Sequence, residues 1–197
     1  MKLVTRMAVA VLATVAALGA ASRAEAGLIP VSVSVLPDAG NWRWTYGVVV
    51  TTDVAVQPGD FFTIYDFGGL VSGSIVAPVD WLISTSPVGP TPSGTSPTDG
   101  PETNLTFTYS GGASIVGSVG LGNFWAISVY SDGTTSDFTS VTHRQVDGRA
   151  EANITSTDVP VPGQVHESPE PATLALFGLG LPLTGFVSWL RRRRAQV

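Results

Sequence analysis

The sequence predicts an all-β protein: a single antiparallel β-sandwich, an architecture that includes the jelly roll. Three observations favour it. Apolar and polar residues alternate in short runs between Gly27 and Thr157, turn residues separate these runs about every 8 to 12 positions, and no stretch between them has a convincing helical period. Two apolar end segments flank this region, and we expect an N-terminal signal peptide and a C-terminal transmembrane helix there.

Residues 1–26 have the three parts of a secretory signal peptide. A positively charged start precedes an uncharged run, residues 7–21, that is short for a stable membrane span. Ala24 and Ala26 then give the small-x-small pattern that signal peptidase cleaves. We therefore expect Sec-type export and a mature chain that begins at Gly27.

The strands of the sandwich are expected within residues 27–157, a length typical of one domain. The clearest alternation covers residues 31–35 and 42–50, where every second residue is apolar or aromatic. Further β-rich runs cover residues 61–67, 79–84, 105–109, 114–119, 124–130 and 138–142, with a weaker one at 150–155. Eight or nine strands of this kind would be enough for two packed sheets.

Two segments are too rich in proline to be strands. Residues 86–103 contain five prolines in 18 residues, and since proline cannot donate to a sheet ladder, a long exposed loop is expected there. Residues 158–168 also contain prolines, and we interpret them as a linker that holds the domain away from the membrane.

The charge of the exported part restricts its partners. Residues 27–168 contain three arginines and thirteen Asp or Glu residues, a formal charge of −10. Such a surface repels nucleic acid and anionic headgroups and favours cations or neutral sugars, although acidity also simply keeps secreted proteins soluble. The absence of cysteine excludes disulfides and thiolate metal sites.

Residues suited to catalysis are few. His143 could pair with Asp132 or Asp137, but no Gly-x-Ser-x-Gly sequence in residues 27–168 supplies a nucleophilic serine, and no histidine pair suits zinc. We therefore expect no enzymatic activity and no cofactor.

Trp42, Trp44 and Tyr46 lie on one face of a predicted strand. Exposed rings in this arrangement would form a stacking platform for sugars. Val48 and Val50 continue the same face, which favours the alternative that the rings fill the core.

Asp132 and Asp137 form the other candidate binding site. Their carboxylates could ligate calcium together with nearby carbonyl groups. The spacing fits no EF-hand, and Asp132 followed by glycine is also ordinary hairpin chemistry, so a simple turn is the competing interpretation.

The tail, residues 169–197, has the features of a membrane segment. Residues 172–190 are uncharged, and a helix of that length spans about 28 Å, close to the thickness of a bilayer core. Positive charge at its end is retained on the cytoplasmic side, which predicts a single-pass precursor with its C-terminus inside. The charge is an arginine cluster: Arg191, Arg192, Arg193 and Arg194.

The order of these features resembles the PEP-CTERM sorting signal of exported bacterial proteins. The residues that carry the resemblance are Pro169, Glu170 and Pro171, followed by the apolar span and the arginine cluster. The resemblance implies recognition by an exosortase-type membrane enzyme and loss of the tail. A permanent single-span anchor is the alternative, because the apolar span and the arginines alone would suit both.

These observations together predict an exported protein that passes through the cell envelope to the cell surface or extracellular matrix. Because the PEP-CTERM class is associated with exopolysaccharide-producing bacteria, the leading hypothesis is a non-catalytic structural protein associated with exopolysaccharide. The alternative is a carbohydrate- or calcium-binding sandwich module.

Overall fold

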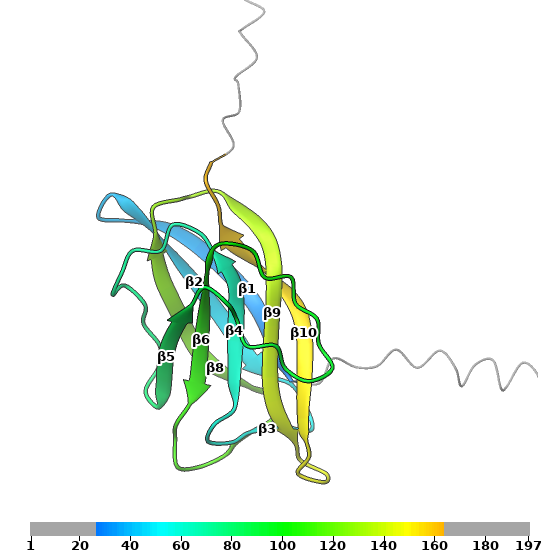
Figure 1. Cartoon of the computed structure of the whole chain (residues 1–197). Coiled ribbons are helices and arrows are strands. Elements are labelled where there is room, and N and C mark those ends of the chain that lie inside the picture. Colours follow the sequence, from blue (N-terminus) through cyan, green and yellow to red (C-terminus); the bar gives the residue numbers. More distant parts are fainter. Residues whose placement is uncertain (1–26, 164–197) are drawn as a thin grey trace, which may run out of the picture. The chain divides into compact units, whose positions relative to one another are not determined.

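The computed structural model describes residues 27–163 (Figure 1). Within this range the chain forms ten strands and no helix, and the strands make two antiparallel sheets, as the sequence predicts. They belong to a compact unit that ends at Gly163. The predicted signal peptide and the predicted transmembrane span, residues 172–190, lie outside the described residues. Inside them, no helix has the length and hydropathy needed to cross a bilayer.

The smaller sheet has three strands in the order β1-β2-β8. They are β1 (Leu28–Asp38), β2 (Asn41–Val50) and β8 (Val119–Ser128). A two-residue turn joins β1 to β2, with positive φ at both Ala39 (48°) and Gly40 (87°). Positive φ at both central residues is the turn geometry that matches the twist of a hairpin, so this turn fixes the register of the pair.

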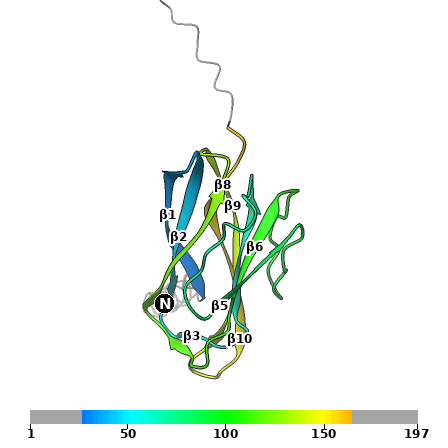
Figure 2. The same cartoon turned by 90° about the vertical axis from the view of Figure 1, so that its left-hand side faces the viewer.

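The larger sheet has seven strands in the order β5-β6-β4-β9-β3-β7, with β10 paired to β9 (Figures 1 and 2). The strands are β3 (Val54–Val56), β4 (Phe61–Phe67), β5 (Trp81–Ser86), β6 (Thr103–Tyr109), β7 (Ile115–Val116), β9 (Gly133–Arg144) and β10 (Ala150–Pro160).

The observed strands follow most of the predicted runs, with several differences. The predicted run 114–119 is divided between β7 and the start of β8. β3 was not predicted, because three apolar residues give too short a pattern to detect. β9 begins at Gly133, so residues that were predicted as a turn extend the strand. β10 continues to Pro160, so residues 158–160 belong to the last strand and not to the linker.

Aromatic rings fill the space between the two sheets. Phe62 has no exposed surface and packs against the four rings of Trp81, Phe107, Phe124 and Phe138, with centroids 4.8 to 5.6 Å away. Such pairs contribute about 0.5 to 1.5 kcal/mol each beyond the burial of area. Phe124 comes from the smaller sheet and the other rings from the larger one, so this cluster holds the sheets together.

Candidate functional site

The aromatic face of β2 is directed into the core. Trp44 and Tyr46 are only 2% and 1% exposed, and the Nε1 of Trp44 donates a hydrogen bond to the Tyr130 carbonyl at 3.0 Å. Trp42 is partly buried and packs against the same core. A stacking platform needs accessible ring faces, and Trp44 and Tyr46 do not offer them.

Asp132 and Asp137 do not converge on one point. Asp132 precedes β9, whereas Asp137 lies within the strand, and at about 3.3 Å per residue Gly133 and Asp137 are already about 13 Å apart. The Oδ2 of Asp137 accepts a hydrogen bond from the Thr98 N–H at 2.6 Å. Among the residues that the structure describes, no group of three or more His, Asp or Glu side chains could hold a metal ion.

His143 has a different partner from the two considered in the sequence analysis. Its Nδ1 lies 3.0 Å from the carboxylate oxygens of Asp60, which is 2% exposed and also accepts the Gln57 N–H at 2.7 Å. The pairing with Asp132 or Asp137 is therefore wrong. The contact connects the turn before β4 to β9. We therefore interpret the pair of His143 and Asp60 as a structural contact.

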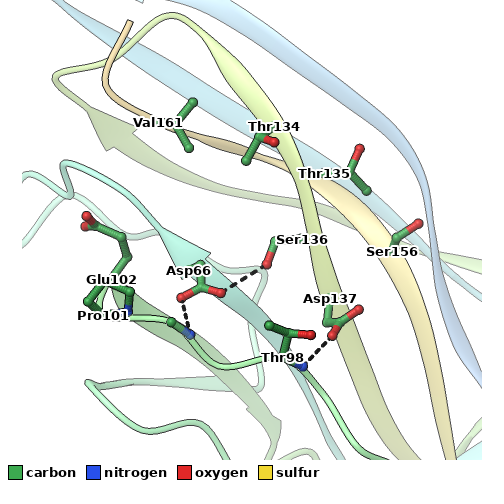
Figure 3. Close-up of a pocket in the computed structure, with 11 residues that line it drawn as sticks. Asp66, Thr98, Pro101, Glu102, Thr134, Thr135, Ser136, Asp137, Ser156 and Val161 are labelled. Atoms are coloured by element: carbon green, nitrogen blue, oxygen red, sulfur yellow. Dashed lines mark hydrogen bonds between the residues drawn. The ribbon is translucent and has the colours of Figure 1, made fainter. Parts of the chain in front are cut away.

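An open hollow of about 350 Å³ lies beneath the proline-rich loop, residues 86–103 (Figure 3). The loop crosses the face of the larger sheet that is turned away from the smaller sheet (Figures 1 and 2). Most of the lining residues carry a carboxylate or a hydroxyl group, although apolar atoms make up the larger part of the exposed lining surface. Its principal side chains are those of Asp66, Thr98, Glu102, Thr134, Thr135, Ser136, Asp137 and Ser156.

A bulge in β4 directs Asp66 into this hollow. The register between β4 and β6 shifts between Ile64 and Phe67, and Asp66 has a φ of 55°. Its Oδ1 accepts the Gly100 N–H at 2.8 Å, and its Oδ2 lies 3.4 Å from the Ser136 hydroxyl (Figure 3). A Cβ at position 100 would lie 2.6 Å from Asp66 Oδ1, so this close approach requires glycine.

A second carboxylate, that of Asp99, binds the loop to itself and to β6. Its Oδ2 accepts the Gly89 N–H at 2.8 Å and its Oδ1 accepts the Asn104 Nδ2 at 2.7 Å. Asn104 is 1% exposed and in turn accepts the Asp66 N–H at 2.9 Å. We call Asp66, Asp99 and Asp137 the carboxylate clasp, because each accepts a backbone N–H of the loop.

Tyr65 anchors the loop next to the clasp. Its side chain is fully buried, its hydroxyl donates to the Pro90 carbonyl, and the Thr139 hydroxyl lies 3.2 Å away. Burial raises the pKa of Tyr65, the Thr139 hydrogen bond lowers it in part, and the charges of Asp99 and Asp137 raise it further. The loop is thus bound to the sheet by the buried Tyr65 side chain and by the three carboxylates of the clasp.

The predicted loop corresponds to the segment between β5, which ends at Ser86, and β6, which begins at Thr103, but the sequence did not indicate the clasp. Asp66 and Gly100 are 34 residues apart, and Thr98 and Asp137 are 39 apart. The glycine after Asp99 suggests only a local turn. No pattern in the sequence places these residues together.

The polar side chains of the hollow can form hydrogen bonds to a ligand. Its hydroxyls can donate and accept, and its carboxylates can accept from the hydroxyl groups of a ligand. The aromatic rings that usually stack on sugars are not among its lining residues. A polyhydroxylated ligand bound here would therefore be held by polar contacts.

Comparison with known proteins concerns the tail. A search of curated proteins finds no match to the chain. Residues 169–194 match the PEP-CTERM protein-sorting motif, which includes Pro169, Glu170, Pro171 and the arginine cluster. The chain therefore carries a PEP-CTERM sorting motif, which implies an exported protein that exosortase, a membrane enzyme, processes on its way to the cell surface.

Proposed function

We propose that the exported sandwich is a non-catalytic structural component of the extracellular matrix, and that it associates with exopolysaccharide through the hollow beneath the proline-rich loop. The lining of the hollow is the observation that supports this function, since carboxylates and hydroxyls suit the hydroxyl groups of a polysaccharide. Residues 27–163 contain twelve acidic residues and three arginines, which favours a neutral polymer over an anionic one.

Affinity electrophoresis of the mature protein in gels that contain the exopolysaccharide of its host tests this proposal. We expect the polymer to retard the wild type. Glu102→Ala and Thr135→Ala, which change the lining but not the clasp, should reduce the retardation, and Ser34→Ala on β1 should not. Equal mobility of the wild type with and without polymer would contradict the proposal.

We further propose that the tail is removed and does not remain as a permanent anchor. Both fates use the apolar span and the arginine cluster to halt translocation. Only recognition by exosortase needs Glu170, since a lipid-embedded helix does not depend on a residue outside the bilayer.

Immunoblots of membrane and surface fractions distinguish the two fates. In a host with exosortase, the wild type should be shortened and released, whereas Glu170→Ala should stay in the membrane at full length after signal cleavage. A host without exosortase provides the control and should retain both proteins. Equal lengths for wild type and variant in the competent host would support a permanent anchor.

A further inference from the structure

The residue predicted to begin the mature chain, Gly27, is buried and contacts both sheets. Thr51, which binds it, directly follows β2 of the smaller sheet. Ser140 and Asn153, which lie against it, belong to β9 and β10 of the larger sheet. Gly27 is therefore part of the folded sandwich and not a free extension before it.

Thr51 holds Gly27 through three hydrogen bonds. The Gly27 N–H donates to the Thr51 Oγ1 at 2.9 Å, and the Thr51 hydroxyl and N–H donate to the Gly27 carbonyl at 3.0 and 3.1 Å. The next residue is tied to the other sheet, since the Leu28 N–H donates to the Ser140 Oγ at 3.2 Å. One threonine thus satisfies both backbone groups of Gly27.

The site requires glycine at position 27. Gly27 has a φ of 140°, a conformation that residues with a side chain rarely adopt. A Cβ at this position would lie 2.9 Å from the Asn153 Cβ and 3.0 Å from the Ser140 Oγ. Signal peptidase selects small residues before the bond that it cleaves, so cleavage does not explain the glycine after it. The requirement comes from the folded domain.

Asn153 has an unused polar group beside Gly27. Its Nδ2 is buried and has no hydrogen-bond partner among the described residues. This atom lies 3.5 Å from the place that a Cβ of residue 27 would take. A half-turn of the amide brings the Oδ1, an acceptor, to the same place. In the uncleaved chain that acceptor lacks a donor, because the single N–H of Gly27 is already donated to Thr51.

Cleavage by signal peptidase supplies the missing donors. Hydrolysis adds one water across the peptide bond between Ala26 and Gly27, and the new carboxylate leaves with residues 1–26. The Gly27 nitrogen becomes an α-amino group, which is mostly protonated at neutral pH. An ammonium group has three N–H donors, so one can stay with Thr51 while another bonds to Asn153.

We propose that Thr51 and Asn153 form a binding site for the α-ammonium group that signal peptidase creates at Gly27. The same cleavage then frees the domain and supplies the group that fixes the beginning of β1 against both sheets. This inference rests on the predicted cleavage after Ala26. It depends neither on binding of polysaccharide nor on the fate of the tail.

The sequence provides a direct probe of this group. The only lysine of the chain is Lys2, which lies in the predicted signal peptide, so the α-amino group is the only primary amine of the mature protein. An N-hydroxysuccinimide ester labels it, and mass spectrometry of the N-terminal tryptic peptide, residues 27–43, measures the label. The same peptide shows where the mature chain begins, and a start other than Gly27 would overturn the proposal.

The labelling rate is compared in folded and unfolded protein purified from the producing host. The ester should label the folded protein at least about ten times more slowly than the protein in concentrated urea, because hydrogen bonds must open before the amine can react. This comparison needs no variant. Equal rates in the two conditions would overturn the proposal.

Matched variants identify the residues that protect the amine. Thr51→Ala and Asn153→Ala should each raise the labelling rate of the folded protein at least about fivefold, since each loses an acceptor. Thr51→Ser keeps the hydroxyl and should restore slow labelling, and Thr52→Ala, a change at the exposed neighbour, should label like the wild type. Circular dichroism shows that each variant is folded. A wild-type rate in folded Thr51→Ala or Asn153→Ala would contradict the proposed site.

Discussion

The two faces of the larger sheet are stabilised in different ways. The inner face packs Phe62 and its ring neighbours against the smaller sheet, and these contacts are between aromatic rings. The outer face holds the proline-rich loop through the carboxylate clasp and Tyr65, and its contacts are hydrogen bonds to backbone groups.

This difference shows how one sheet can form part of the core on one face and hold a locally stabilised loop on the other. Apolar burial is shared by many residues, so damage to the inner face lowers the stability of the whole domain. Hydrogen bonds of the clasp each fix one point of the loop, so damage to the outer face should release the loop and leave the sheets intact.

Removal of the central ring should have the largest effect. Phe62→Ala deletes a fully buried side chain that contacts four other rings, and we expect the free energy of unfolding to fall by about 3 to 5 kcal/mol. Urea titration followed by tryptophan fluorescence measures the loss. Phe62→Leu, which keeps most of the volume, should lose clearly less; an equal loss in both variants would argue against ring packing as the cause.

Damage to the clasp should cost less and act locally. Asp66→Ala removes the acceptor of the Gly100 N–H and places alanine at positive φ, so a loss of about 2 to 3 kcal/mol is expected. Limited proteolysis should cut residues 86–103 faster while the core stays resistant.

Two matched variants sharpen the result for Asp66. Asp66→Asn keeps an acceptor and tolerates the positive φ, so it should be milder than alanine. Asp147→Ala removes the same charge from the exposed β9–β10 hairpin and should leave cleavage of the loop unchanged. Faster loop cleavage in Asp147→Ala would indicate a general effect of charge.

Two buried tyrosines, Tyr46 in β2 of the smaller sheet and Tyr65 in β4 of the larger one, should make stability depend on alkaline pH. Burial raises the pKa of Tyr46 well above its ordinary value, with a further contribution from the charge of Asp158, and burial also raises that of Tyr65. Above about pH 10 the unfolded chain releases these protons and the folded chain retains them. The contribution of these two tyrosines to stability should therefore be constant below about pH 10 and fall above it, by up to about 1.4 kcal/mol per pH unit for each tyrosine.

Urea titrations between pH 8 and pH 11.5 measure this slope. Tyr65→Phe should remove one part of it and Tyr46→Phe another, because phenylalanine does not titrate. Slopes unchanged in both variants would mean that other groups cause the alkaline loss.

The same contrast explains what the sequence could predict. Alternation in β2 and the dense aromatic run of β4 follow from which side chains face the core, so these strands were found nearly at their observed bounds. The clasp and the contact between His143 and Asp60 join polar residues far apart in the chain. Polar contacts of this kind leave no periodic pattern, so only the folded structure reveals them.

Amide hydrogen exchange of the folded protein tests the central claim, that carboxylates order the loop independently of the core. The N–H groups of Gly89, Thr98 and Gly100, which bond to the clasp, should exchange far more slowly than that of the exposed Gly94 in the same loop. In Asp66→Ala, Gly100 should exchange as fast as Gly94, while the amides of β4 and β6 keep their protection. Exchange of Gly100 at the rate of Gly94 in the wild type would contradict the account.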